Sequence, residues 1–343
     1  MKANNQRLIA NWLYFGACCI AIQILLGGIT RLTGSGLSIT EWQPLIGSIP
    51  PITEGEWLLS FHKYQQIAQF HVLNAHFSLE DYKSIFFWEW LHRNWARFLG
   101  LAFLLPMAYF IFHKKISRKL IPALSILFLL GLLQGVIGWI MVKSGLNQTA
   151  TRVDHIKLAI HFIAALLLLC YTLWVAFSMS MQELKMRHRL RFTTLNAVLL
   201  ALLVLQMIYG AFMAGSNAAL AAITWPDMNG TFLPNQGIIG LSLNSLSGNL
   251  LNIQFIHRNL AYLIFLLTLV LYWRNRSWKI NPSLSLIRAI PPILVFIQCV
   301  LGVSTLLHSL EKSYRIYALL HQFTGILLLV SLLLMLFLNL KRT

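Results

Sequence analysis

Four histidines lie inside apolar segments that are long enough to cross a membrane. They are His92, His161, His257 and His321, and each lies near the start of its segment. An ionisable side chain within a membrane-spanning helix is costly and therefore indicates a functional site. Imidazole is a good ligand for iron, so two histidines on neighbouring helices can supply both axial ligands of one heme. We expect two such pairs, against the alternative that these are core or helix-end histidines without a ligand.

An acid and its neutral counterpart distinguish the first pair from the second. Glu89 lies three residues before His92, so both side chains face the same side of a helix. The equivalent position before His257 is Gln254, which cannot ionise. This asymmetry predicts chemistry in the first half of the chain and cofactor binding in the second. The alternative is an interface carboxylate paired with an arginine.

Arginines follow two of the histidines. Arg93 and Arg258 come directly after His92 and His257, and Arg97 lies one turn further along. Arginine binds carboxylates in a bidentate manner and stays charged. These residues are therefore candidates to bind the propionates of a heme, with snorkelling of the side chains to the membrane interface as the alternative.

The four histidines occupy equivalent positions of an internal repeat. The matching segments are 89–96 with 254–261, 134–138 with 298–302, 156–161 with 316–321 and, more weakly, 23–27 with 206–210. An ordered series with polar anchors is not expected by chance among apolar helices. Each half holds four helices, so the halves should share one orientation about an axis near the membrane normal. We predict an all-α polytopic membrane protein of two pseudo-symmetric four-helix bundles, residues 1–180 and 190–343.

Composition supports a membrane protein. Hydrophobic residues make up 57% of the 343 residues and charged residues only 11%, whereas a soluble domain carries about 25% charged residues. A spanning helix needs about 20 apolar residues. Eight runs meet this requirement, at 11–30, 90–112, 119–142, 155–179, 192–214, 254–273, 286–307 and 314–340. The net charge of +17 does not indicate nucleic acid, because the basic residues cluster in short loops between these runs.

The charged loops predict the orientation of the chain. Basic residues gather on the side that an eight-helix order assigns to both termini, namely Lys2, Arg7, Lys114, Lys115, Arg118, Lys119, Lys185, Arg187, Arg189, Arg191, Arg274, Arg276, Lys279, Lys341 and Arg342. Every acid except Glu183 falls on the other side. By the positive-inside rule both termini are cytoplasmic, and the histidines lie towards the outer face.

Two long outer loops are expected, at about 31–88 and 215–253. The amphipathic stretch 57–64 in the first loop predicts a surface helix. The segment 33–51 is expected to be a lid over the site in the first half, because Gly34 and Gly36 permit unusual backbone angles and three prolines restrict the rest. The alternative is a simple connector.

The motifs together resemble the heme A synthase family. The resemblance rests on residues 27–42 (GGITRLTGSGLSITEW), residues 134–146 (QGVIGWIMVKSGL) and Glu89-x-x-His-Arg, and it covers nearly the whole chain. The branch shared by mitochondria and proteobacteria is the most similar. The other branch carries a cysteine pair in the first outer loop. Here the four cysteines, Cys18, Cys19, Cys170 and Cys299, all lie in apolar runs, so a thiol-based step does not transfer.

The resemblance implies a reaction and assigns roles. Heme O would be oxidised at its C8 methyl group to a formyl group, giving heme A for a terminal oxidase, by two hydroxylations with water-derived oxygen followed by loss of water. His257 and His321 would ligate a heme b cofactor in residues 190–343, with Arg258 beside it. His92 and His161 would hold the iron of the substrate heme in residues 1–180, where Glu89 would accept a proton or stabilise positive charge.

The expected partners follow from the resemblance, and the rival functions follow from the residues themselves. The expected setting is the cell inner membrane, with lipid around the helices and contact with the farnesyltransferase that makes heme O. The electron acceptor and a homo-oligomeric state stay open. A di-heme b-type cytochrome that only transfers electrons would show the same four histidines, but it does not explain the difference between Glu89 and Gln254. A repeat-based transporter predicts polar residues at the membrane midplane, and here they lie towards one face.

Overall fold

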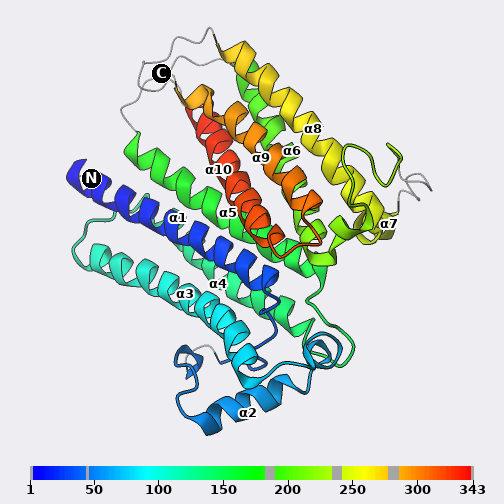
Figure 1. Ribbon diagram of the computed structural model, residues 1–343. Helices are drawn as coiled ribbons and strands as arrows, with labels where there is room; N and C mark the ends of the chain where they lie inside the picture. Colours follow the sequence, from blue (N-terminus) through cyan, green and yellow to red (C-terminus); the bar gives the residue numbers. More distant parts are fainter. Residues whose placement is uncertain (1–2, 44–45, 182–189, 234–241, 277–285, 341–343) are drawn as a thin grey trace. The chain divides into compact units, whose positions relative to one another are not determined.

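The computed structural model describes residues 3–43, 46–181, 190–233, 242–276 and 286–340 (Figure 1). Within these ranges eight helices are long and apolar enough to cross a membrane, which confirms the predicted all-α polytopic class. Several charged residues behind the orientation prediction lie outside the described residues: Lys2, Glu183, Lys185, Arg187, Arg189, Lys279, Lys341 and Arg342.

The eight long helices follow the predicted order. They are α1 (Ala3–Leu32), α3 (Leu79–Phe112), α4 (Ile121–Lys143), α5 (His155–Ser180), α6 (Leu190–Ser216), α8 (Leu250–Asn275), α9 (Ile290–Leu307) and α10 (Tyr314–Leu340). The shorter elements are η1 (Ile46–Ser48), α2 (Glu54–Tyr64), η2 (Phe70–Asn74), η3 (Ala218–Ala221) and α7 (Leu243–Gly248). Helix α2 confirms the surface helix expected around residues 57–64, and its N-terminus is fixed by a capping box between Thr53 and Glu56.

Helix α3 begins much earlier than predicted, at Leu79 and not near residue 90. Ser78 and Asp81 form a capping box that starts the helix in the polar outer region, where apolar periodicity gives no signal. Glu89 and His92 therefore lie well inside a continuous helix, and the prediction that every histidine is within two turns of its helix start is wrong for His92. It holds for His161, His257 and His321.

The chain divides into two compact units, Met1–Met179 and Ser180–Thr343. In the first unit α1 packs against α3, and an apolar cluster joins both to α4 and α5 through residues such as Leu13, Phe110, Leu124 and Ala176. A second cluster packs the first outer loop onto α3: Leu37, Tyr64, Ile67, Tyr82, Ile85 and Phe86. The loop is thus built into the core of this unit.

The second unit is a closed ring of helix contacts. Helix α6 packs against α8 and α10, and α9 packs against α8 and α10. The second outer loop folds back, because η3 contacts both α6 and α8. Backbone polar groups in the body of a spanning helix are satisfied within the helix, which is why this architecture suits a lipid environment. Large apolar side chains are exposed on the helices, for example Leu129 and Leu132 of α4, as expected for surfaces that face lipid.

Candidate functional site

Two of the predicted histidines face each other in the second unit. The rings of His257 on α8 and His321 on α10 have centroids 6.4 Å apart, with an interplanar angle of 69°. A metal–imidazole bond is about 2 Å long and the ring centre lies about 1 Å beyond the nitrogen, so two imidazoles on opposite sides of one metal have centres about 6 Å apart. The observed separation fits two axial ligands of a single iron.

Each of the four histidines packs against a glycine on a neighbouring helix. A Cβ atom added at Gly27 would lie 3.3 Å from Nε2 of His92. At the other three glycines the added Cβ would lie nearest to Cε1 of the facing histidine. The distances are 3.0 Å for Gly138 and His161, 3.4 Å for Gly210 and His257, and 2.9 Å for Gly302 and His321. Contacts shorter than ordinary van der Waals distance at Gly138 and Gly302 leave no room for a side chain. The absence of a side chain at these glycines therefore leaves the space that the imidazole rings occupy.

A glutamine precedes each of these glycines by four residues, and three of them contact the histidine. Gln23 and Gln206 donate from Nε2 to the backbone oxygens of His92 and His257, at 3.2 and 3.0 Å. The Nε2 atoms of Gln206 and Gln298 lie 3.4 and 3.3 Å from Nε2 of His257 and His321. In the described part of the chain Gln134 shows no such bond to His161. In the sequence these residues serve only as markers of the repeat, and their packing on the histidines is a new finding.

Several polar atoms around the histidines are buried without a hydrogen-bond partner among the described residues. They include Nδ1 of His161 and His257 and Oε1 of Gln23, Gln206 and Gln298. Buried polar groups in proteins nearly always have a partner, so a cluster of unsatisfied atoms around imidazoles points to a bound ligand. The described residues contain no group of three or more His, Cys, Asp or Glu side chains that would hold a bare metal ion. Paired histidines with an apolar surround fit heme, whose porphyrin supplies the remaining ligands to iron.

The first unit holds the other pair in a different arrangement. His92 on α3 and His161 on α5 both belong to this unit, and each packs against a glycine of a neighbouring helix. His92 turns Nε2 and Cδ2 towards its glycine, whereas the other three histidines turn Cε1 towards theirs. The structure thus places both members of the predicted pair within one unit, and it distinguishes His92 from its counterparts.

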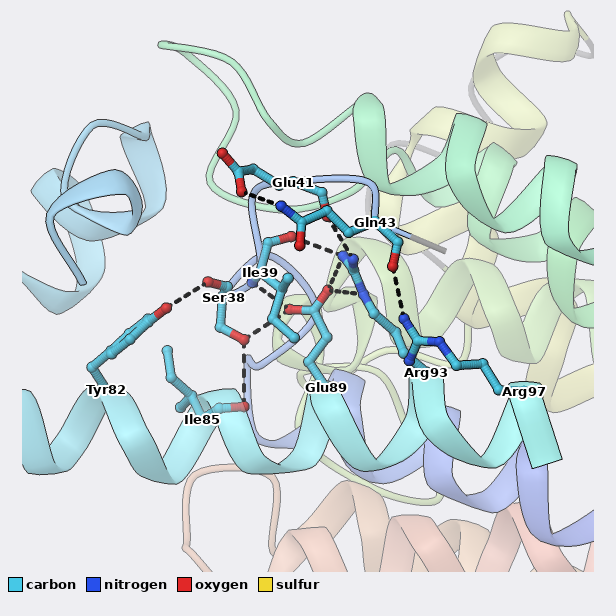
Figure 2. A network of polar contacts seen from close by, with 9 residues as sticks. All are labelled: Ser38, Ile39, Glu41, Gln43, Tyr82, Ile85, Glu89, Arg93 and Arg97. Carbon is cyan, nitrogen blue, oxygen red and sulfur yellow. Dashed lines mark hydrogen bonds and ion pairs between the residues drawn. The ribbon is translucent and has the colours of Figure 1, made fainter. Parts of the chain in front are cut away.

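Glu89 is the centre of a hydrogen-bond network between α3 and the first outer loop (Figure 2). Its side chain is buried, with 2% of the residue exposed. One carboxylate oxygen accepts from the Ser38 hydroxyl at 2.8 Å and from the Ile39 backbone N–H at 2.9 Å. The other accepts from Nε and Nη2 of Arg93 at 3.2 and 2.7 Å. Four donors, two of them from the Arg93 guanidinium, thus engage both oxygens of this buried carboxyl group.

The arginines of α3 bind the outer loop as well. Arg93 donates to the backbone oxygens of Ile39 and Glu41 at 2.8 and 2.9 Å, and Arg97 donates to that of Gln43 at 2.9 Å (Figure 2). Tyr82 donates to the backbone oxygen of Ser38 at 3.2 Å. The network fastens residues 38–43 to the helix that carries His92. Sequence reasoning missed Ser38 and Ile39, because loop partners about fifty residues away along the chain leave no local signal.

In the second unit a similar set of hydrogen bonds joins α8 to the second outer loop, with Gln254 at the position equivalent to Glu89. Gln254 donates to the backbone oxygen of Ala222 at 2.6 Å, and Arg258 donates to those of Ala222 and Asp227 at 2.9 and 2.7 Å. Arg258, expected to bind the cofactor, thus uses these donors on the second outer loop. There the Thr224 hydroxyl and the Gly230 N–H bind the Asp227 carboxylate and hold the pKa of that group below its ordinary value.

Comparison with known proteins gives one consistent answer. Residues 10–333 match the COX15-CtaA family, described as cytochrome oxidase assembly protein. The heme A synthase of Flavobacterium johnsoniae is 37% identical over 336 residues, which cover 96% of each chain. The heme A synthase of Parvibaculum lavamentivorans is 39% identical over 88% of this chain and 87% of its own. That of Rhodospirillum centenum is 43% identical over 80% of this chain and 73% of its own.

Proposed function

Because the chain belongs to the COX15-CtaA family of heme A synthases, we propose that its two units divide the reaction between a cofactor heme and a substrate heme. It is a multi-pass membrane oxidoreductase that converts heme O to heme A by oxidising a methyl group of the porphyrin to a formyl group. The division of labour rests on one observation above all. Both units carry histidines from the repeat, but among the described residues only the first has a buried carboxylate, Glu89, three residues before such a histidine.

The second unit is the cofactor site in this proposal. His257 and His321 ligate the iron of a heme b, which supplies one-electron redox chemistry when bound. Their ring separation of 6.4 Å and the unpartnered Oε1 atoms of Gln206 and Gln298 beside them support this assignment. Arg258 acts here mainly by fastening the second outer loop through Ala222 and Asp227, with its charge available to a propionate at the same end of α8.

The first unit is the substrate site. His92 and His161 hold the iron of heme O and so fix the position of its reacting methyl group. Glu89 has all its lone pairs engaged by Ser38, Ile39 and Arg93, which disfavours removal of a proton by this group. Its fixed negative charge instead stabilises positive charge that develops at the reacting carbon, since preorganised charges act strongly where water is excluded.

The first outer loop covers this site. Leu37 and Ser38 are almost fully buried, with exposed fractions of 2% and 1%. Gly34 has a φ of 71°, a left-handed conformation that turns the chain from α1 into the loop and that favours glycine. Because Ser38 and Ile39 of the loop bind Glu89 directly, the position of the loop also fixes the position of the carboxylate. We infer that the loop excludes water from the methyl group during oxidation.

The setting follows from charge and chemistry. The termini are cytoplasmic, and the paired histidines lie towards the outer face of the cell inner membrane. Heme O comes from the farnesyltransferase that makes it. Contact between the two enzymes in the lipid bilayer would let this apolar molecule pass between them without entering water.

The heme composition of the purified protein tests this proposal. We expect heme b together with heme O or heme A after extraction and mass analysis, and His321→Ala should retain only the latter type. Two molecules of heme b per chain would favour the rival function, a di-heme electron carrier, and would contradict a substrate site in the first unit. Retention of heme b by His321→Ala would overturn the assignment of the cofactor site.

A further inference from the structure

We propose that the Gln-x-x-x-Gly segments of α4, α6 and α9 are positioning elements, in which the glycine uncovers the backbone oxygen of the glutamine as a hydrogen-bond acceptor for the Nδ1–H of the facing histidine. The segments are Gln134–Gly138, Gln206–Gly210 and Gln298–Gly302. They face His161, His257 and His321 in that order. The inference rests on the proposed function, because it concerns the orientation of the heme ligands.

Helix geometry gives the reason for a spacing of four residues. The backbone oxygen of a helical residue points towards the residue four positions later. The side chain at that later position leans back over the preceding turn and covers this oxygen from the side. Glycine has no side chain, so it leaves the second lone pair of the oxygen open to a group from a neighbouring helix.

The arrangement is complete in α9. Nδ1 of His321 lies 3.0 Å from the backbone oxygen of Gln298. A Cβ atom at Gly302 would lie 2.9 Å from Cε1 and 3.4 Å from Nδ1 of the same ring. The hydrogen bond and a side chain at residue 302 therefore exclude each other.

This hydrogen bond decides which nitrogen can ligate iron. A proton on Nδ1 that is donated to a carbonyl leaves the lone pair of Nε2 for the metal, fixes the ring orientation and makes the ligand more basic. The side-chain amide of Gln298 lies within hydrogen-bond distance of that Nε2 lone pair, at 3.3 Å, and iron would take its place there. One segment thus contacts both nitrogens of His321.

Two other segments share the design in a looser form. Cε1 of His257 and of His161 is the atom nearest to Gly210 and Gly138. Nδ1 of both rings is buried and has no hydrogen-bond partner in the described ranges, so a small shift towards the glutamine oxygen on ligand binding would satisfy it. His92 departs from the pattern, because it turns Nε2 towards Gly27, and we leave it out of the proposal.

The test compares alanine substitutions at glycines with and without a facing histidine. Gly302→Ala should displace His321, and Gly210→Ala should act more weakly on His257, because its added Cβ would lie at 3.4 Å rather than 2.9 Å. Gly131→Ala in α4 is the matched control, because a Cβ there meets nothing within 4 Å. Loss of a partner that orients a metal ligand weakens metal binding about 10- to 100-fold, so we expect the affinity of Gly302→Ala for heme b to fall by this factor and its heme retention to decrease.

Three readouts besides activity are measured on the purified membrane protein: heme retention, the electron paramagnetic resonance spectrum of the ferric heme, and the midpoint potential. We expect altered g values and a more positive potential in Gly302→Ala, since a less basic ligand stabilises ferric iron less well, and no change in Gly131→Ala. If Gly302→Ala does not accumulate, Gly138→Ala decides, because its added Cβ would lie 3.0 Å from Cε1 of His161. The readout is then retention of the heme in the first unit. Unchanged values in the deciding variant overturn the inference.

The failure of the inference is distinguishable from that of the proposed function. If His321→Ala loses heme b while Gly302→Ala behaves like the control, only the role of the glycine segment is wrong. If His321→Ala keeps heme b, the cofactor site itself is misassigned.

Discussion

Replacement of Glu89 by glutamine gives the sharpest test of the division between the two units. The carboxylate is 2% exposed and accepts four hydrogen bonds, two of them from Arg93. Glutamine has nearly the same shape, but it carries no charge and one of its two polar groups is a donor. The donor would face either Ile39 and Ser38 or Arg93, so the variant must give up one side of the network.

The magnitude follows from the burial of this pair. Removing one partner of a buried ion pair costs about 3 to 5 kcal/mol, so we expect a clear decrease in the thermal stability of the first unit. The loss of one preorganised group that stabilises a transition state lowers a rate about 100- to 1000-fold. Glu89→Gln should therefore bind heme b normally but accumulate heme O or a hydroxylated intermediate in place of heme A.

The assay is extraction of hemes from membranes that contain each variant, followed by separation and mass analysis. Ser38→Ala is the matched control, because it removes a hydrogen bond of 2.8 Å to the same carboxylate but keeps the charge. It should retain most of the heme A yield. A normal yield from Glu89→Gln would refute the electrostatic role, and an equal loss in Ser38→Ala would assign the effect to the loop and not to the charge.

Three further predictions concern the outer loops. Arg258→Ala removes the guanidinium donors to Ala222 and Asp227 and leaves only the Gln254 bond to Ala222. Residues 222–230 should therefore become sensitive to protease added at the outer face, and unchanged resistance would contradict the anchoring role of Arg258. The pKa of Asp227 lies below its ordinary value of 3.8 because the Thr224 hydroxyl and the Gly230 N–H bind the ionised form. The stabilisation of the loop by the ionised carboxylate is complete above pH 3.8 and disappears as the pH falls through the lowered pKa of Asp227. Protease should therefore cut this loop only below pH 3.8. A loss of protection near neutral pH would contradict this role of Asp227. Gly145→Ala would place a Cβ 2.8 Å from Leu37 and 3.0 Å from the backbone nitrogen of Val153; overpacking of this kind costs about 1 to 3 kcal/mol, and an unaltered melting temperature would show that the lid does not depend on this contact.

The sequence predicted the helices well because apolar runs of spanning length are a strong signal. It failed at the start of α3, where Leu79 to Glu89 form polar and amphipathic turns outside the apolar run. The helix begins at the capping box of Ser78 and Asp81, which apolar periodicity does not detect. Helix starts that lie outside the apolar region are therefore the least predictable boundaries in a membrane protein.

The candidate site was predictable as a set of residues but not as a set of contacts. The repeat identified the histidines and the difference between Glu89 and Gln254 from sequence alone. The partners of Glu89 come from a loop distant along the chain, and only the folded unit brings Ser38 and Ile39 to it. The spacing of glutamine and glycine was visible in four helices, yet its meaning depends on which ring packs against it. The sequence therefore shows the spacing of glutamine and glycine, and only the folded structure shows which histidine each glycine contacts.

The central claim is that two histidine pairs hold two different hemes. It is tested most directly by the heme content of His92→Ala and His257→Ala, purified in parallel with the unaltered protein. We predict that His257→Ala loses heme b, and that His92→Ala keeps heme b but loses bound heme O and heme A. Loss of the same heme from both variants would contradict the account.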